Sequence, residues 1–119
     1  MARLKLKLQL YCGDEIAMGP GKADLLEAIA SEGSISAAAR ALGMSYRRAW
    51  LLVDTMNRCF RAPLVETHPG GGTQAGARLT PQGEAALAAY RTLSAQVEAG
   101  VPGTDFEVLK MAIRPEPAR

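Results

Sequence analysis

The chain is poor in the residues from which most enzyme and metal sites are built. Its 119 residues include one histidine, His68, and two cysteines, Cys12 and Cys59. The cysteines lie far apart and match neither a zinc-binding nor a redox spacing, so we expect reduced cytosolic thiols. No acidic cluster offers paired acids for catalysis. These shortages argue against an enzyme and against a bound metal or other cofactor.

Long apolar runs are also missing. Residues 4–10 alternate leucine with lysine or glutamine, and residues 1–11 contain no long apolar centre. This pattern predicts neither a signal peptide nor a membrane span. We therefore expect a soluble, cytoplasmic protein without a membrane partner. The length fits one domain, and domains of this size often gain stability by forming dimers.

Acidic residues are scarce in the middle of the chain. Residues 33–80 contain two acidic residues against six basic ones, a net charge of +4, whereas the remainder has a net charge of −2. The six basic residues are all arginines, whose guanidinium groups fork onto phosphate oxygens or a guanine edge. They are Arg40, Arg47, Arg48, Arg58, Arg61 and Arg78. A basic centre suits nucleic acid, although a solvated charged face would have the same composition.

Local patterns predict a mainly helical chain with little β structure. Alternation over residues 4–10 predicts a half-buried strand, which the turn at Gly13 and Asp14 pairs with a strand at 15–18. A first helix follows residues 19–22, has Asp24 and Glu27 in its early turns, and stops at Gly33. Further helices are predicted at 37–42, 46–60 and 81–98, and two short strands at 64–67 and 77–79. Residues 106–113 fit either a strand or a short helix.

Residues 38–52 carry the pattern of a helix-turn-helix. Ser36 is expected to cap the first helix of the pair and Ser45 the second. Ala39 is small enough for a close helix crossing, and Gly43 tolerates the positive φ of the turn. The residues expected to point into the crossing are Ala38, Leu42, Met44, Ala49 and Leu52.

The exposed start of the second helix is the expected DNA-contacting surface. The N-terminal part of a recognition helix meets base edges and phosphates. Its residues here are Ser45, Tyr46, Arg47, Arg48, Trp50 and Leu51, to which we add Ser36. Trp50 has two interpretations, since it either touches DNA or packs against its own domain.

The glycine-rich segment between the two later strands predicts a wing that reaches along a minor groove. Its expected DNA contacts are Thr67, His68, Gly70, Gly71, Gly72 and Arg78. The alternative is a hairpin without a binding role. We expect no catalytic work from His68.

The last long helix is the expected dimer element. Leu87, Tyr90, Leu93 and Val97 fall on one side of it, where they serve either a homodimer interface or the internal core. Two-fold symmetry would place two recognition helices roughly 34 Å apart on duplex DNA. The predicted fold is therefore a winged helix-turn-helix at 1–99, with an N-terminal β-hairpin and a C-terminal dimerisation helix, followed by a short extension at 100–119.

Several motifs resemble the DNA-binding domain of ModE-type molybdate-dependent transcriptional regulators. They are residues 19–22, 33–50, 63–67 and 77–83, in the family's order, and the resemblance covers about residues 3–98. The chain is similar, more distantly, to the N-terminal domain of LysR-type regulators. This resemblance implies a winged-helix homodimer that binds operators near genes of molybdenum metabolism, with DNA contacts at residues 45–48 and the wing.

One departure from ModE-type regulators concerns the molybdate sensor. Full members carry C-terminal domains that bind molybdate, but only about twenty residues follow the last long helix here. We expect no direct molybdate site in this chain, which would be constitutive, respond to a separate partner or serve another regulon. The alternative function is a protein-interaction module that heterodimerises with a full-length relative or docks a partner through residues 106–113.

Overall fold

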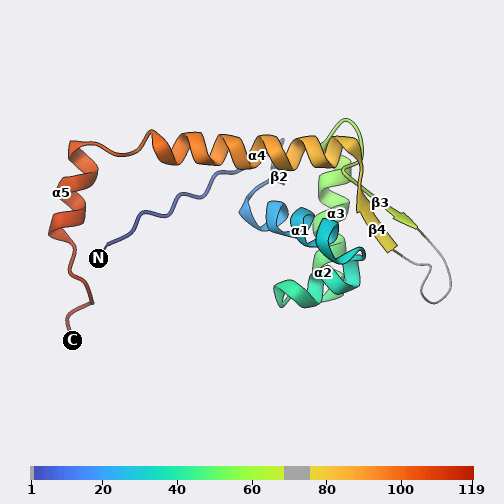
Figure 1. The fold of residues 1–119 in the computed structure, drawn as a ribbon, viewed down its shortest axis with the longest axis horizontal. Helices are drawn as coiled ribbons and strands as arrows, with labels where there is room; N and C mark the ends of the chain where they lie inside the picture. The colour runs from blue at the N-terminus through green and yellow to red at the C-terminus, as the bar shows by residue number, and fades with distance from the viewer. Residues whose placement is uncertain (1, 69–75) are drawn as a thin grey trace.

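Three helices, α1 to α3, pack around one apolar core, and two short antiparallel hairpins flank them (Figure 1). The structure is a computed structural model that describes residues 2–68 and 76–119. Its elements are β1 (Leu10–Cys12), β2 (Glu15–Met18), α1 (Pro20–Glu32), α2 (Ile35–Leu42), α3 (Tyr46–Cys59), β3 (Val65–His68), β4 (Gly76–Leu79), α4 (Pro81–Ala99) and α5 (Thr104–Ala112). This order confirms the predicted winged helix-turn-helix.

The long helix α4 gives the molecule its elongated shape of 57 × 34 × 25 Å. It starts beside the β3–β4 hairpin, runs past α1, and carries α5 away from the core, so that both termini lie at the α5 end (Figure 1). Residues 106–113, which fitted either a strand or a helix, lie mostly in α5, which has no buried residue.

The core is built around α1. Its side chains Leu25, Leu26 and Ile29 have no exposed surface. Ala38 on α2 and Ala49 on α3 are equally buried. Because both are small, α2 and α3 cross closely, which is the packing that a helix-turn-helix requires.

Most helix boundaries follow local signals in the sequence. The Ser45 hydroxyl accepts a hydrogen bond from the Arg48 amide at 3.1 Å and caps α3. The Thr80 hydroxyl accepts one from the Gly83 amide at 3.0 Å and caps α4. Gly43 ends α2 with φ of 69°, in the left-handed region that favours glycine. The predictions for Ser45 and Gly43 are confirmed.

Two predictions about α2 are wrong. The cap is Ser34, whose hydroxyl accepts from the Ala37 amide at 3.0 Å, and not Ser36. Because α2 starts at Ile35, the Ile35 side chain is buried, with 5% of its surface exposed. A helix that started at residue 37 would leave Ile35 outside it. Leu42, the last residue of α2, is not part of the core predicted for it and is 38% exposed.

The strand predicted over residues 4–10 is also wrong for most of its length. In the ladder of β1 with β2, Cys12 lies opposite Glu15 and Leu10 opposite Met18. The chain then leaves the ladder to form α1, so no strand remains to pair with residues 4–9. Instead the Tyr90 hydroxyl of α4 donates a hydrogen bond to the Leu8 carbonyl at 2.8 Å.

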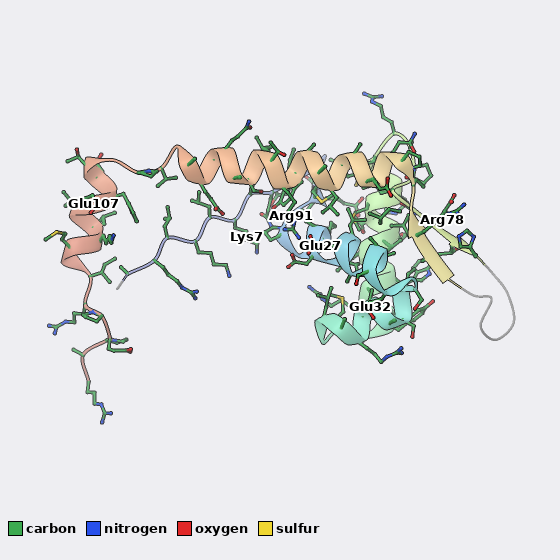
Figure 2. All side chains as sticks on the ribbon, in the orientation of Figure 1. Lys7, Glu27, Glu32, Arg78, Arg91 and Glu107 are labelled. Carbon is green, nitrogen blue, oxygen red and sulfur yellow. The ribbon has the colours of Figure 1, made fainter. Side chains whose placement is uncertain are left out.

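The acidic residues Asp24 and Glu27, expected in the early turns of α1, pair with α4. Because α1 begins at Pro20, neither Asp24 nor Glu27 lies in its first turn. Both accept hydrogen bonds from the Arg91 guanidinium of α4, at 3.0 and 3.3 Å. Figure 2 shows Arg91 of α4 beside Glu27 of α1. The two carboxylates hold α4 against α1 at the surface, where such pairs contribute little to stability.

Gly83 sets how closely α4 approaches the β3–β4 hairpin. A Cβ atom at this position would overlap the backbone carbonyl of Leu64, which also accepts the Thr80 amide at 2.9 Å. We predict that Gly83→Ala lowers the free energy of unfolding by about 3 kcal/mol, since backbone cannot move aside cheaply. Gly21→Ala in α1 is the control, because open space surrounds Gly21. Equal melting temperatures for both variants would contradict this account.

Candidate nucleic-acid interface

The first turns of α3 form an exposed surface that mixes aromatic and basic side chains. Tyr46 is 56% exposed and Trp50 is 46% exposed. Arg47 and Arg48 are also exposed, next to the Ser45 cap. The exposure of Trp50 favours the interpretation in which it faces a partner. Ala49 and Val53 are buried and point inward. The helical period therefore directs the aromatic and basic side chains at the start of α3 toward solvent.

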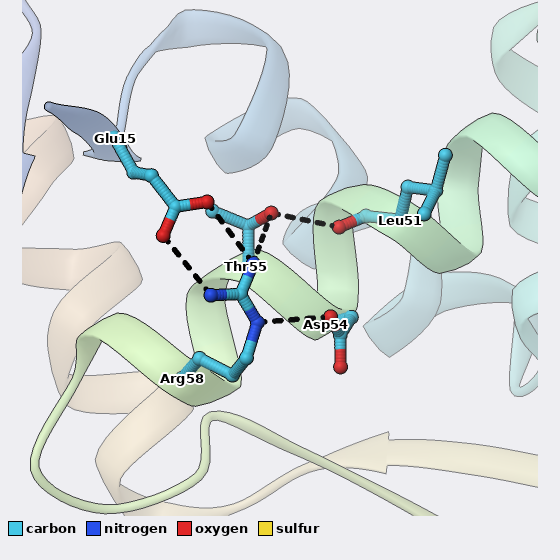
Figure 3. A network of polar contacts seen from close by, with 5 residues as sticks. All are labelled: Glu15, Leu51, Asp54, Thr55 and Arg58. Atoms are coloured by element: carbon cyan, nitrogen blue, oxygen red, sulfur yellow. Dashed lines mark hydrogen bonds and ion pairs between the residues drawn. The ribbon is translucent and has the colours of Figure 1, made fainter.

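The basic residues of the central stretch divide into engaged and free groups. Arg58 donates to both carboxylate oxygens of Glu15 at 3.0 Å and to Asp54 at 3.0 Å (Figure 3). Arg78 pairs with Glu66 across the β3–β4 ladder. Within residues 2–68 and 76–119, Arg47 and Arg48 make no ion pair. Arg40 and Arg61 also make no ion pair in these ranges, so the cations at the start of α3 are among those available to an anion.

The Arg58 network lies at the other end of α3 and has a structural role. The hydrogen bonds from Arg58, and then its charge, hold the pKa of Glu15 below its usual range. Both side chains are half-exposed, so the pair is screened by solvent. It joins β2 to α3 across 43 positions of sequence.

Lys22, near the start of α1, is a basic residue that the sequence reasoning missed. Partial burial lowers its pKa, and the charge of Arg48 also lowers it. The one signal in the sequence for a contact between Lys22 and an anion is its position in the first turn of α1, because the start of a helix attracts anions.

A shallow pocket of about 230 Å³ links the start of α3 to the wing. Its lining includes four residues predicted to contact DNA, namely Ser36, Tyr46, Thr67 and His68. Thr67 is exposed and His68 is half-buried. The structure therefore brings the two predicted contact regions together. Gly70, Gly71 and Gly72 lie outside the described residues.

Asn57 fixes the wing to α3. Its amide oxygen accepts from the Leu64 amide at 2.9 Å and from the Val65 amide at 3.2 Å. Its amide nitrogen donates to the Val65 carbonyl at 3.0 Å. The sequence reasoning missed this residue, although it lies four positions after buried Val53 on a face where a polar side chain needs partners.

The residues predicted for a dimer differ in their surroundings. Tyr90 is buried within the chain and Leu87 is half-buried against the core. Leu93 and Val97 are 38% and 39% exposed. Leu93 also lines an apolar pocket of about 170 Å³ between α4 and the N-terminal hairpin.

No described helix combines the length and apolar composition needed to cross a bilayer. In the same two ranges, 2–68 and 76–119, no three His, Cys, Asp or Glu side chains group as metal ligands.

Residues 22–84 match the family model described as "Bacterial regulatory helix-turn-helix protein, lysR family". The chain is 50% identical over 80 residues to the molybdenum-pterin-binding protein MopB of Rhodobacter capsulatus, covering 67% of this chain and 30% of that protein. It is 38% identical over 91 residues to the DNA-binding transcriptional dual regulator ModE of Escherichia coli K12, covering 76% and 33%. The chain thus spans about a third of the length of these curated relatives.

A solved structure has a similar fold. The protein in the crystal structure of a CbnR_DBD–DNA complex superposes with a TM-score of 0.53 at 23% identity, covering 79% of this chain and 97% of that chain. Together with the sequence matches, this confirms the resemblance to LysR-type and ModE-type regulators.

Asn57 offers a test of how the wing is held. We predict that Asn57→Ala lowers the free energy of unfolding by about 2 kcal/mol, because it leaves the amides of two buried residues, Leu64 and Val65, without this partner. Amide hydrogen exchange should accelerate at Leu64 and Val65 before the rest of the core. Gln96→Ala, which removes an exposed amide from α4, is the matched control. Unchanged exchange at Leu64 and Val65 would show that Asn57 does not hold the wing.

Proposed function

This chain belongs to the LysR family of bacterial regulatory helix-turn-helix proteins, and we propose that it is a DNA-binding transcriptional regulator that reads a specific duplex site as a homodimer. The observation that carries the proposal is the exposed start of α3. There Arg47 and Arg48 are free of acidic partners among the described residues and lie at the positive end of the helix dipole.

In this proposal α3 is the recognition helix and its first two turns enter the major groove. Arg47 and Arg48 each donate to a guanine edge or to phosphate. The Ser45 and Tyr46 hydroxyls donate to phosphate oxygens, which sets the register of the helix on the duplex. Trp50 and Leu51 supply apolar contacts to thymine methyl groups or sugars.

The wing extends the proposed contact surface. Thr67 and His68 share a pocket with Ser36 and Tyr46, so a backbone phosphate near α3 would also lie near β3. Arg78 is paired with Glu66 but remains largely exposed, and a phosphate can compete for it. Gly70, Gly71 and Gly72 stay predicted contacts of the wing in the adjacent minor groove.

The proposed dimer uses the exposed part of α4. Leu93 and Val97 supply apolar surface there, while Leu87 and Tyr90 mainly complete the core of each subunit. Two copies related by a two-fold axis would present their α3 helices about one DNA turn apart, roughly 34 Å. We keep 1–99 as the proposed DNA-binding domain and 100–119 as its extension.

The names of the relatives support a proposed link to molybdenum. Two of them are called a molybdenum-pterin-binding protein and a molybdenum transport protein. We propose that the genes regulated by this chain belong to molybdenum metabolism. This proposal concerns the target genes, because the chain covers only about a third of those relatives.

A second candidate function is that of a protein-interaction module. The observation in its favour is α5, where Val108, Leu109 and Met111 are more than half exposed. Such a helix could dock a second regulator. A pure interaction module, however, has no need of two free arginines at the start of α3.

The recognition assignment predicts the effect of removing each arginine. Arg47→Ala and Arg48→Ala should each weaken binding to a selected genomic duplex about tenfold or more, since a base-edge or phosphate contact is lost. Melting temperatures should not change, because both side chains are exposed. Fluorescence anisotropy with labelled duplex measures the effect, and Arg114→Ala in the exposed tail is the control. Unchanged affinity in both variants would remove α3 from the interface.

The dimer proposal predicts the effect of a charge on α4. Leu93→Asp and Val97→Asp should each convert the particle from twice the 12.6 kDa chain mass to the monomer mass, because an unpaired carboxylate is costly in an apolar interface. Light scattering measures the mass, and circular dichroism checks that the variant is folded. Leu109→Asp on α5 is the matched control. A stable dimer in both α4 variants would show that this helix face is not the interface.

A further inference from the structure

The fold brings the two cysteines to one corner of the molecule, although they are far apart in the sequence. Cys12 is the last residue of β1, and Cys59 is the last residue of α3. Both are free thiols. Their meeting was not predicted, because the spacing matches no redox motif.

The backbone register explains the meeting. Cys12 lies directly opposite Glu15 in the β1–β2 ladder, and residues opposite one another point to the same face. Glu15 is held by two 3.0 Å hydrogen bonds from Arg58, the chain neighbour of Cys59 (Figure 3). The face of the hairpin that carries Cys12 is therefore fastened to the end of α3 that carries Cys59.

The two thiols also differ in access. Burial raises the pKa of Cys59, and the neighbouring Cys12 thiol raises it further. Cys12 is exposed, whereas Cys59 is half-buried. A reagent from solution therefore reaches Cys12 first.

We propose that Cys12 and Cys59 are a modification site, at which exchange with a low-molecular-weight disulfide forms a reversible disulfide between β1 and α3. The Cys12 thiolate attacks one sulfur of the small disulfide, forms a mixed disulfide and releases one small thiolate. The Cys59 thiol then loses its proton and attacks the Cys12 sulfur, which releases the second small thiolate. The two cysteine thiols are oxidised, and the small disulfide is reduced to two thiols.

This bond acts on stability and leaves the start of α3 accessible. Cys59 ends a helix of 14 residues, so the bond forms about 20 Å from Tyr46. A cross-link that closes a long loop restricts the unfolded chain more than the folded one. We expect the oxidised protein to melt roughly 10 °C above the reduced protein.

The experiment treats the full chain with glutathione disulfide, blocks remaining thiols, and maps the peptides by mass spectrometry. The expected product is a cross-linked pair of peptides containing Cys12 and Cys59, two hydrogens lighter than the reduced pair and released by dithiothreitol. The same sample should show the higher melting temperature.

Single variants provide the controls. Cys12→Ser and Cys59→Ser should each lose the cross-linked peptides and the rise in melting temperature. A persistent mixed disulfide at Cys12 in the unmutated protein, or chains joined to one another through Cys12, would overturn the proposal. So would an oxidised protein that melts at the temperature of the reduced one.

Discussion

The close crossing of α2 and α3 is the constraint on which the rest of the structure depends. Ala38 and Ala49 are fully buried, and their small side chains let two helices meet around the turn that Gly43 closes. Once Ala49 faces inward, the helical period directs Arg47 and Arg48 toward solvent. Asn57, two turns further along α3, then fastens the wing to the same helix. The placement of the proposed DNA-contacting surface thus follows from packing at one crossing.

The fold determines which arginines of the central stretch are paired and which are free. The central stretch has six arginines, but the structure uses Arg58 to fasten the N-terminal hairpin to α3 and pairs Arg78 with Glu66. Such exposed pairs add little stability, yet a phosphate must compete with a carboxylate for these two cations. The free arginines at the start of α3 coincide with a helix end whose dipole also favours anions. The presence of free arginines at this helix end supports the DNA-binding proposal more than the net charge does.

Sequence reasoning succeeded where the signal is local and failed where the partner is distant. Ser45, Thr80 and the glycine at position 43 act on residues within one turn, so their roles could be predicted. The strand expected at residues 4–9 failed because a strand needs a partner, and β2 turns into α1 too early to provide one. The contacts of Asn57 with β3, and the meeting of the two cysteines, depend on tertiary packing that no short pattern encodes.

The central claim is that two copies of this chain read duplex DNA through paired α3 helices. The most direct test selects genomic fragments with the purified protein and measures affinity for the recovered duplexes by anisotropy across a salt series. The account predicts an inverted repeat with half-sites about one helical turn apart, and affinity that falls a hundredfold or more between roughly 50 and 200 mM salt. Weak binding without sequence preference would contradict it.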